Sequence, residues 1–296
     1  MLDIGIIGLD TSHAEAFAPL IDETEDMTVS AVWDDNSVRE PSYTESFASK
    51  YDARYVHEPG EMVSYVDAAM VLTVDWGTHR PLATPFLEAG VPTLIDKPLA
   101  GRYEDIEAIA AATEHAPLFG GSAVPFHPEI TSLMREETGR SLFGAGYNDY
   151  FYYRVHMVDA VRMLADADWT EVRVVDSPGT RTEIRFSNGT HGTIRFDGTP
   201  TNASFGLLDV GTETRAVRIE GNETSFAEMY APFLDAFESV ARGERDDTRR
   251  LLDSATLLLG IEAAIESGRT VTPDSDLLRE VYRDGDSFLA EYEPYY

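Results

Sequence analysis

The chain begins with the stretch LDIGIIGLDTSH (residues 2–13), which points to an α/β fold. Residues 2–8 are a short, mostly apolar run of the kind found in buried strands. Thr11 or Ser12 then provides a cap for a helical pattern over residues 15–22. A strand that turns directly into a helix is the building unit of a parallel sheet, so this stretch predicts a strand–helix–strand domain.

The alternation of strand and helix continues to about residue 120. Further strands are expected at residues 28–33, 68–73, 93–95 and 117–119. Helices are expected between them at residues 42–51, 79–89 and 103–114. Strands that alternate with helices of this length predict a doubly wound parallel sheet, which we assign to a first domain, residues 1–120.

After residue 120 the strand patterns follow one another, which predicts a second α/β domain with a mostly antiparallel sheet, residues 121–296. The strands are expected at residues 172–176, 183–186, 193–196, 203–208 and 215–219. Asn188-Gly189 predicts a hairpin with a type I′ turn, because both residues accept a positive φ. Helices are expected at residues 154–164, 226–241, 248–267 and 273–296, and the C-terminal ones are free to pack on the first domain.

Composition narrows the classes of function. The 296 residues are 43% hydrophobic, which suffices for a large core and about two domains. The absence of cysteine excludes a thiol nucleophile and a disulfide scaffold. No apolar run reaches about 18 residues, and the N-terminus lacks a signal-peptide pattern. We therefore expect a cytoplasmic protein without membrane contact.

The net charge of −30, from 23 basic and 53 acidic residues, is the most unusual property of the chain. It repels phosphate backbones and anionic lipid, so nucleic acid and membranes are poor partners. Only Lys50 and Lys97 are lysines, and the other basic residues are arginines. Many carboxylates with almost no lysine indicate a halophilic protein that works in molar salt, where the Debye length is about 3 Å. The alternative is an acidic protein from ordinary salt.

The turn after the first strand is a candidate cofactor site, because ligands of parallel sheets bind beyond the carboxyl ends of the strands. A dinucleotide loop has the pattern G-x-G-x-x-G. Here Gly8 fills the first position, whereas Asp10 and His13 fill the second and third. The helix N-terminus, with the hydroxyls of Thr11 and Ser12, still offers N–H groups and a positive dipole end. An ordinary capped turn is the other interpretation.

Three further strand ends carry polar residues. Asp34 ends the second strand, where an acidic group suits a ribose 2′-hydroxyl and repels a 2′-phosphate, which favours NAD over NADP. Residues 73–79 and Asp96-Lys97-Pro98 follow two other buried strands and should rim the same crevice. Lys97 stands in a chain that otherwise uses arginine, which favours a need for lysine chemistry, since burial lowers the pKa of an ammonium group.

At these residues the chain resembles the family of glucose–fructose oxidoreductase, inositol dehydrogenase and MocA-like (Gfo/Idh/MocA) oxidoreductases. Asp96-Lys97-Pro98 stands for its E-K-P motif, and residues 73–79 look like its T-P-x-x-x-x-H segment. Phe126-His127-Pro128 falls where the family has an aromatic-x-Pro motif, and His156-Met157-Val158-Asp159 looks like its H-x-x-D helix. The likeness covers residues 4 to about 271. It implies a Rossmann domain followed by an open sheet that is often buried in a homodimer or homotetramer.

The resemblance implies an NAD(P)-dependent oxidoreductase that moves a hydride to or from a secondary alcohol of a sugar, polyol or related small molecule. It places Lys97 at the substrate and the nicotinamide, His156 as acid and base, and Asp159 as a contact to the substrate or to His156. Tyr152 stands where many members have Asp. The tyrosines form either an aromatic substrate pocket or a tyrosine-rich strand that packs on the sheet; they are Tyr147, Tyr150, Tyr152 and Tyr153. The expected cofactor residues are Gly8, Asp10, Thr11, Ser12, His13, Asp34, Thr73, Asp75, His79, Asp96 and Lys97.

Two other functions stay open at this point. A tightly held NAD can oxidise a sugar transiently and allow elimination, which would make the chain a hydrolase or lyase. A non-catalytic binding or regulatory protein on the same fold is the second, and the missing glycines favour it. No metal is expected, because Asp10, His13, Asp75, His79 and His127 show no recognised ligand spacing.

We expect the protein to keep its structure in molar potassium chloride and to unfold on dialysis to low salt. Dilution restores the repulsion among carboxylates that concentrated salt screens. Far-UV circular dichroism along a salt series measures this. Full stability at low salt would instead identify an acidic protein without a salt requirement.

Overall fold

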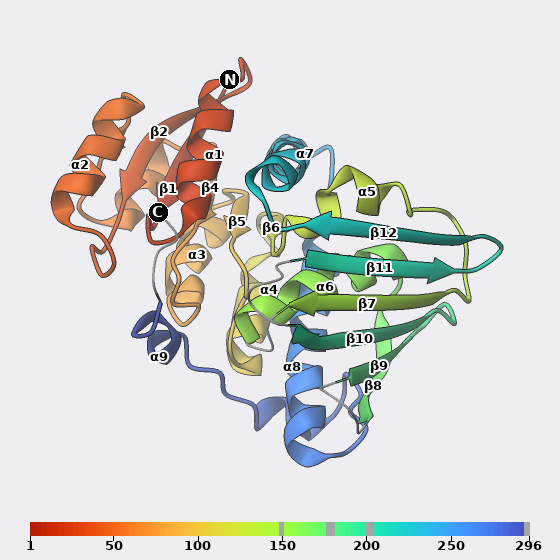
Figure 1. Cartoon of the computed structure of the whole chain (residues 1–296). Helices are drawn as coiled ribbons and strands as arrows, with labels where there is room; N and C mark the ends of the chain where they lie inside the picture. Colours follow the sequence, from red (N-terminus) through yellow and green to blue (C-terminus); the bar gives the residue numbers. More distant parts are fainter. Residues whose placement is uncertain (148–150, 176–180, 199–203, 293–296) are drawn as a thin grey trace.

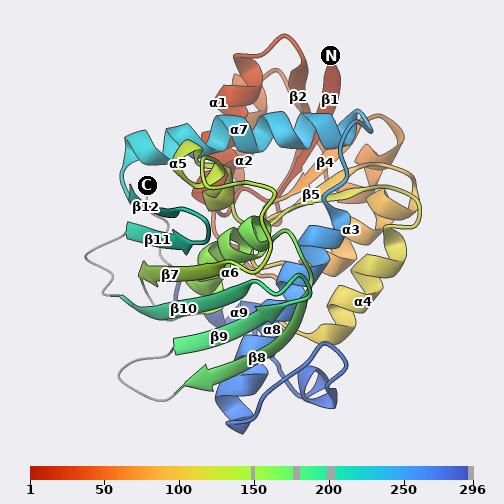
Figure 2. The ribbon, with the colours of Figure 1, turned by 90° about the vertical axis from the view of Figure 1, so that its right-hand side faces the viewer.

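The computed structural model describes residues 1–147, 151–175, 181–198 and 204–292. Two six-stranded sheets, each packed against helices, lie side by side in Figure 1 and one above the other in Figure 2. Their buried side chains form one continuous hydrophobic core. Among these residues, no helix combines the length and apolar character needed to cross a membrane.

The first sheet is parallel throughout, with the strand order β3-β2-β1-β4-β5-β6, and it confirms the predicted doubly wound sheet. Ile4, Ile6 and Ile7 of β1 and every residue of β4 are fully buried, as expected of strands covered on both faces. The sequence does not predict β3, since two residues are too short to show a pattern. The strands are β1 (Leu2–Ile7), β2 (Met27–Trp33), β3 (Arg54–Tyr55), β4 (Ala68–Val71), β5 (Thr93–Ile95) and β6 (Leu118–Gly120).

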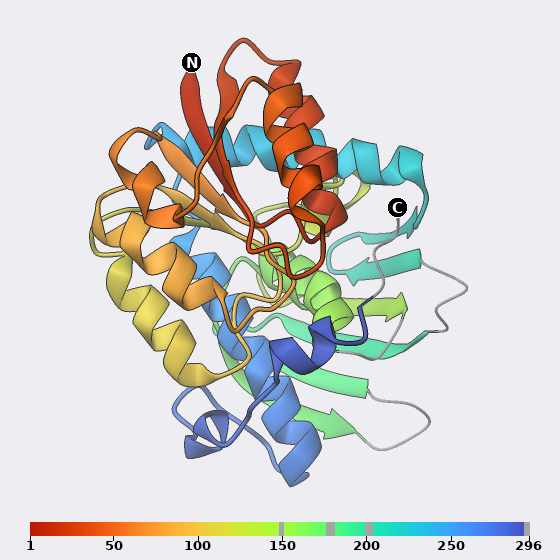
Figure 3. The same ribbon diagram turned by 90° about the vertical axis from the view of Figure 1, so that its left-hand side faces the viewer.

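Helices cover both faces of this sheet, with α1 and α2 on one side and α3 and α4 on the other (Figure 3). Thr11 caps α1 by accepting a hydrogen bond from the main-chain N of His13 at 3.2 Å. The N-terminus of α1 therefore lies at the carboxyl edge of the sheet. The helices are α1 (Ser12–Asp22), α2 (Pro41–Lys50), the 3₁₀ helix η1 (Pro59–Ser64), α3 (His79–Glu88) and α4 (Tyr103–Ala112).

The second sheet has the order β12-β11-β7-β10-β9-β8, and only the β7–β10 pair is parallel, so the predicted mostly antiparallel sheet is confirmed. Two helices, α6 (Phe151–Ala165) and α8 (Thr248–Ser267), cover one of its faces. The expected strand ends Asp176 and Ala203 lie outside the described residues. The strands are β7 (Ser141–Tyr147), β8 (Trp169–Val175), β9 (Arg181–Phe186), β10 (His191–Gly198), β11 (Ser204–Val210) and β12 (Thr214–Glu220).

The sequence misses β7, although this strand lies in the middle of the second sheet. Its glycines weaken a strand pattern, and in the structure they face Met157 of α6. A Cβ on Gly144 would lie 2.7 Å from Cε of Met157, and one on Gly146 would lie 3.1 Å from Cγ of the same side chain. The glycines let α6 approach the sheet closely, which a single-strand pattern does not reveal.

Strands β9 and β10 form the predicted hairpin, but the predicted type I′ turn is wrong. That turn needs a positive φ at both Asn188 and Gly189, and only Gly189 has one, at +83°. The main-chain N of Gly189 donates to the carbonyl of Phe186 at 3.0 Å, and the N of Phe186 donates to the carbonyl of Thr190 at 3.0 Å. This is the longer hairpin loop that ends in a glycine bulge.

The C-terminal helices pack back on the first domain. In α7 (Glu223–Ala241), the ring of Phe233 lies 5.7 Å from that of Phe17 in α1 and 4.9 Å from that of Phe119 in β6. Helix α8 packs against α4 and β6. The short 3₁₀ helix η2 (Val124–Phe126) and α5 (Pro128–Thr131) connect the first sheet to the second.

The helix predicted over residues 273–296 is not formed within the described residues. The tail contains only the 3₁₀ helix η3 (Asp276–Arg279) and the short helix α9 (Gly285–Leu289). Between them, the main-chain N of Arg283 donates to the carbonyl of Gly101 at 2.9 Å, and its carbonyl accepts from Nε1 of Trp76 at 2.7 Å. These groups bond to the first domain, which interrupts a helix. Residues 293–296 lie outside the described part.

Two buried carboxylates tie three strand ends of the first sheet together. Asp10, only 1% exposed, accepts a hydrogen bond from the main-chain N of Val74, beyond β4, at 2.9 Å. Asp34, at the end of β2, accepts one from the N of Leu9, beyond β1, at 2.8 Å. Burial raises the pKa of Asp10 to about 7; the bond from Val74 opposes this rise, and the negative charges of Asp34 and Asp35 add to it.

We expect Asp10→Asn to stabilise the fold at alkaline pH. Folded Asp10 keeps its proton up to about pH 7, whereas the unfolded chain loses it near pH 3.8. In the wild type, the contribution of protonated Asp10 to stability is therefore full below pH 3.8 and is lost as the pH rises through about 7. The neutral amide removes this dependence and still accepts from Val74. Its gain in free energy of unfolding over the wild type should grow by on the order of 2 kcal/mol between about pH 5 and pH 8.

Chemical denaturation at constant salt measures this gain at each pH. Asp22→Asn, which changes an exposed acid on α1, is the matched control. A gain that stays constant across the pH range would contradict the raised pKa of folded Asp10.

Candidate active site

Lys97 follows β5 at the carboxyl edge of the first sheet, and only 4% of its surface is exposed. Its Nζ lies 3.0 Å from the ring centre of Tyr152 and 5.9 Å from that of Tyr153, both on α6. The face of an aromatic ring attracts a cation. Burial lowers the pKa of Lys97 to about 7, and the charge of Asp96 opposes this change. The amine therefore gains and loses its proton near neutral pH.

Asp96 connects Lys97 to the turn after β1. Its Oδ2 lies 2.8 Å from Nδ1 of His13, and its Oδ1 accepts from the main-chain N of Lys97 at 2.7 Å. Burial acts to raise the pKa of Asp96, but the imidazole of His13 and the ammonium of Lys97 outweigh burial and hold it below its usual value. The fold thus brings together three predicted site residues from turns that are 83 residues apart.

His156 on α6 faces the same site. Its Nδ1 lies 2.7 Å from Oγ of Ser122, and its ring meets the ring of Phe205 edge to face at 5.3 Å. Burial lowers the pKa of His156 well below its usual value, and the positive charges of Lys97 and His13 lower it further. The imidazole is therefore neutral at pH 7 and able to accept a proton.

Asp159 acts on His156 through Ser122, a residue that sequence reasoning missed. Asp159 is fully buried, and its Oδ2 accepts from the main-chain N of Ser122 at 2.7 Å. The serine hydroxyl then meets His156 and also accepts from the N of Val124 at 3.1 Å. Asp159 therefore reaches His156 through Ser122 and not through a direct bond, and its expected contact to the substrate stays a prediction. The only signal was the position of Ser122, directly after β6 and Gly120-Gly121.

The expected tyrosine cluster gathers at the start of α6. Tyr147 lies 5.5 Å from Tyr153, and Tyr152 lies 5.2 Å from Tyr153, measured between ring centres. Tyr150 lies outside the described residues. The rings of Tyr152 and Tyr153 face Lys97, so they form one wall of the candidate site.

The acidic residues of the cofactor region form a second group. Carboxylate oxygens of Asp10, Asp34 and Asp35 lie within 4.8 Å of one another. Burial raises the pKa of Asp34 as well, although the main-chain N of Leu9 donates to it. Because Asp10 and Asp34 already hold main-chain N–H groups, we assign the cluster to the turn structure and assign no metal to it.

The segment after β4 is mostly bonded to itself and to its neighbours. The hydroxyls of Thr73 and Thr78 lie 2.7 Å apart, and Asp75 accepts from the main-chain N of Gly77 at 2.8 Å. His79 is fully buried, with its ring nitrogens 3.0 Å from the carbonyl of Thr73 and 3.2 Å from that of Leu99. Its ring joins two turns and has no nitrogen left for a ligand. We therefore assign His79 a structural role in place of the expected cofactor contact.

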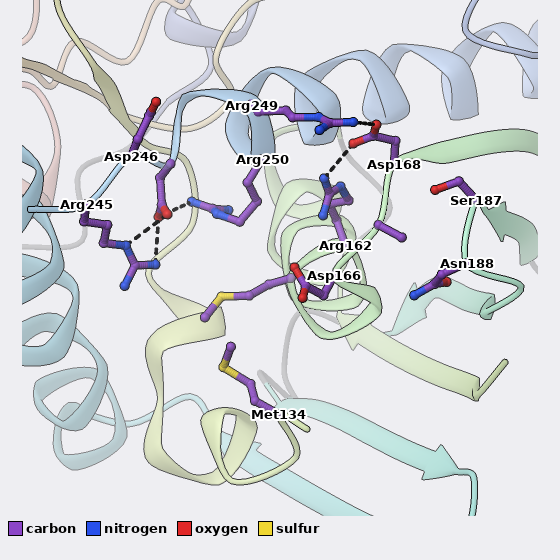
Figure 4. A pocket seen from close by; sticks show the side chains of 13 residues that line it. Met134, Arg162, Asp166, Asp168, Ser187, Asn188, Arg245, Asp246, Arg249 and Arg250 are labelled. Atoms are coloured by element: carbon purple, nitrogen blue, oxygen red, sulfur yellow. Dashed lines mark hydrogen bonds and ion pairs between the residues drawn. The ribbon is translucent and has the colours of Figure 1, made fainter. Parts of the chain in front are cut away.

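A separate cavity of about 530 Å³ lies where the end of α6 meets the start of α8 (Figure 4). Its arginines are held by carboxylates. Arg245 donates to Asp247 through two bonds of 2.9 Å, and Arg162 donates to Asp168 at 3.1 Å. None of the expected site residues lines this cavity, so the candidate active site stays at the carboxyl edge of the first sheet.

This edge fits a dinucleotide. Gly8 has a φ of +91°, and a Cβ there would lie 2.6 Å from Cγ2 of Thr73, so only glycine permits the close approach of the two turns. The first N–H groups of the 11-residue helix α1 lie at this edge and suit a pyrophosphate. Asp34 stands where an acidic residue meets the ribose hydroxyls. Asp10 and His13 depart from the glycine pattern, and both side chains bond across to neighbouring turns.

Comparison with known proteins identifies the first domain. Residues 2–119 match an oxidoreductase family with an NAD-binding Rossmann fold, Gfo/Idh/MocA. YceM of Salmonella typhimurium, provisionally named an oxidoreductase, is 28% identical over 135 residues. The match covers 46% of this chain and 42% of that protein, less than half of either.

Solved structures share the fold over almost the whole chain. The myo-inositol dehydrogenase of Lactobacillus casei, solved with NAD(H) and myo-inositol, has a TM-score of 0.76 at 15% identity, with 92% of this chain and 96% of that chain covered. The scyllo-inositol dehydrogenase of the same organism, solved with NAD(H) and scyllo-inositol, has a TM-score of 0.72 at 15% identity, with 93% and 100% covered. At these identities the likeness establishes the fold alone. Residues 2–119 therefore resemble the NAD-binding Rossmann domain of the Gfo/Idh/MocA oxidoreductases, and the solved structures show that the whole chain shares the fold of the two inositol dehydrogenases.

Proposed function

We propose that the chain is an NAD-dependent dehydrogenase that acts on a secondary alcohol of a sugar, polyol or related hydroxy compound. The observation that carries this proposal is the meeting of two basic groups. Lys97 after β5 and His156 on α6 both approach the ring of Tyr153, whose centre lies 5.9 Å from Nζ of Lys97 and 6.4 Å from the ring centre of His156. Oxidation of an alcohol needs such a pair, because a base must take the hydroxyl proton while a positive charge stabilises the oxygen.

His156 is the acid–base residue in this mechanism. Nδ1 lies 2.7 Å from Oγ of Ser122, and the mechanism uses the tautomer in which Nδ1 donates to this oxygen and Nε2 has a free lone pair. Nε2 takes the proton of the substrate hydroxyl and returns it when the reaction runs in reverse. Asp159 and the main chain of Val124 hold Ser122 and thereby fix the orientation of the ring.

Lys97 stabilises the negative charge that develops on the substrate oxygen. A compact ammonium in a water-poor site attracts an alkoxide more strongly than it would in bulk water. NAD, when bound between Gly8, the N-terminus of α1 and Asp34, supplies the hydride acceptor. Because the pKa of Lys97 is about 7, its charged fraction falls above this pH, and the rate of oxidation should fall with it.

A small polyol-like substrate agrees with the neighbours and with the site. Two of the structural neighbours are inositol dehydrogenases solved with inositols. The ring of Tyr153, whose centre lies 5.9 Å from Nζ of Lys97, offers a face on which the apolar side of a sugar can stack. A cytoplasmic location and a high-salt setting stay predictions.

We expect calorimetry in high salt to show binding of NAD⁺ and weaker binding of NADP⁺. The carboxylate of Asp34 accepts from a ribose hydroxyl and repels a 2′-phosphate. Asp34→Asn keeps an acceptor for the main-chain N of Leu9 and removes the negative charge. The difference in affinity between NAD⁺ and NADP⁺ should therefore be smaller in this variant. If neither dinucleotide binds the wild type, the dehydrogenase proposal fails.

Replacing Lys97 by Ala should abolish turnover while leaving folding and NAD⁺ binding nearly intact. A positioned catalytic group contributes roughly 10²–10⁴-fold to the rate. Folding is spared because the lowered pKa of Lys97 shows that burial of its charge opposes folding. NADH absorbance and thermal denaturation measure the two effects. Lys50→Ala changes the other, exposed lysine and should be neutral, whereas full activity of Lys97→Ala would remove Lys97 from the mechanism.

Product analysis separates the proposed dehydrogenase from the two alternatives. A hydrolase or lyase that oxidises its substrate only transiently turns over without accumulating NADH. A binding protein shows NAD⁺ affinity and no product with any polyol. Steady NADH formation with one product per cofactor is the result expected here.

A homo-oligomer, dimer or tetramer, is proposed on the uncovered face of the second sheet. Phe143 of β7 and Leu208 of β11 are paired neighbours there and are 44% and 37% exposed. Burial of such apolar side chains favours association. Leu208→Arg should dissociate the oligomer in analytical ultracentrifugation, while Met134→Arg, at an exposed apolar residue outside this sheet, should not. A monomeric wild type would reject this interface.

A further inference from the structure

The ring of Tyr152 is held between Lys97 and the C-terminal segment. The Nζ of Lys97 lies 3.0 Å from its centre, and the ring of Phe288 in α9 lies 4.5 Å away at an interplanar angle of 24°. An ammonium 3.0 Å above the ring fills the space that a ring stacked at 4.5 Å would occupy. The two groups therefore lie on opposite faces of Tyr152.

We infer that Tyr152 and Phe288 position the ammonium of Lys97, so that residues 283–289 complete the proposed active site. The catalytic consequence rests on the proposed function, whereas the contact itself does not. Tyr152 attracts the ammonium through its ring face. Phe288 acts on the ammonium indirectly, because it fixes the plane and position of the Tyr152 ring.

The structure gives the ammonium an aromatic partner in place of a carboxylate. Among the described residues, no carboxylate is paired with Nζ of Lys97. The adjacent Asp96 uses Oδ2 for His13 and Oδ1 for the main-chain N of Lys97. A lysine has a long flexible stem and needs a contact to keep one position. A ring face provides that contact without neutralising the charge, which stays available to a substrate oxygen.

The segment that carries Phe288 is anchored upstream of its short helix. The main chain of Arg283 bonds to Gly101 and Trp76, and its Nε donates to Oε2 of the buried Glu262 at 2.9 Å. A Cβ on Gly101 would lie 1.9 Å from the carbonyl oxygen of Arg283, so glycine is required for this approach. Trp76 also packs on Phe288, with ring centres 5.4 Å apart. These contacts give the five-residue helix α9 a fixed place against Tyr152.

The state of the ammonium can be measured without turnover, because the chain has only two lysines. In protein labelled with ¹³C,¹⁵N-lysine, NMR titration of the side-chain Cε signals yields the pKa of Lys97, with Lys50 as internal reference. Tyr152→Leu removes the ring face and should lower the Lys97 pKa by roughly half a unit to one unit. Tyr152→Phe keeps the ring and should leave the titration unchanged.

The contribution of the C-terminal segment is tested with a second pair of variants. Phe288→Ala frees the ring of Tyr152 and should shift the Lys97 titration in the same direction by a smaller amount. Phe288→Tyr keeps the stacking on Tyr152, so the pKa of Lys97 should equal that of the wild type. Tyr282→Ala, at a residue directly before this segment that is 56% exposed and faces Arg102, is the matched control and should have no effect.

Turnover provides the catalytic readout. In Tyr152→Leu, kcat should fall about tenfold with KM nearly constant, because a misplaced ammonium weakens stabilisation of the transition state. The alkaline limb of the pH–rate profile should move to lower pH together with the lysine titration. Tyr152→Phe, which keeps the ring face, should rescue most of the rate that Tyr152→Leu loses and should move the alkaline limb back toward the wild-type pH.

Two results would overturn the inference. One is an unchanged Lys97 titration in Tyr152→Leu, and the other is an equal effect of Tyr152→Phe and Tyr152→Leu, which would assign the role to the hydroxyl. A titration that moves as expected in a protein without dehydrogenase turnover would reject the proposed function and keep the contact. If thermal denaturation shows that Tyr152→Leu does not fold, the Phe288 pair decides the question.

Discussion

The ammonium of Lys97 is buried, and its surroundings explain how the candidate site is tuned. Removal from water disfavours the charged amine, so its pKa lies at about 7. The ring of Tyr152 favours the charged form, while the nearest carboxylate along the chain, Asp96, is engaged by His13. The same positive charge helps to keep His156 neutral. A charged donor and a neutral base thus arise side by side from one buried cation, which is the division of roles that alcohol oxidation needs.

The buried carboxylates of this acidic protein have a structural role as hydrogen-bond acceptors. Asp10, Asp34 and Asp159 each accept a hydrogen bond from a main-chain N of a strand-end turn. Buried N–H groups need such partners, and a carboxylate is a strong acceptor. In this way the turns after β1, β2, β4 and β6 are tied to one another or to α6. The geometry at the sheet edge depends on these internal acids, although they are a small part of the 53 acidic residues.

The parallel sheet was predictable because its strands are covered on both faces and read as short apolar runs. Two elements were predicted wrongly, strand β7 and the tail after α8. Strand β7 was missed because glycines interrupt its strand pattern where Met157 of α6 packs against it. The tail after α8 has helical composition, yet the main chain of Arg283 bonds to the first domain instead of continuing a helix. Both errors arise where a distant element takes the place of a local pattern.

For the site, local sequence was enough to single out Asp96 and Lys97, because both directly follow a buried strand, whereas His156 was expected only from the resemblance of its helix to a known family. Nothing local indicated that Ser122 would meet His156, or that Phe288 would lie against Tyr152. Those contacts join segments 34 residues or more apart, and they depend on the direction of side chains after the two sheets have packed. Periodicity and spacing describe how a chain lies relative to its own neighbours, whereas the partner of a buried side chain is set by three-dimensional packing.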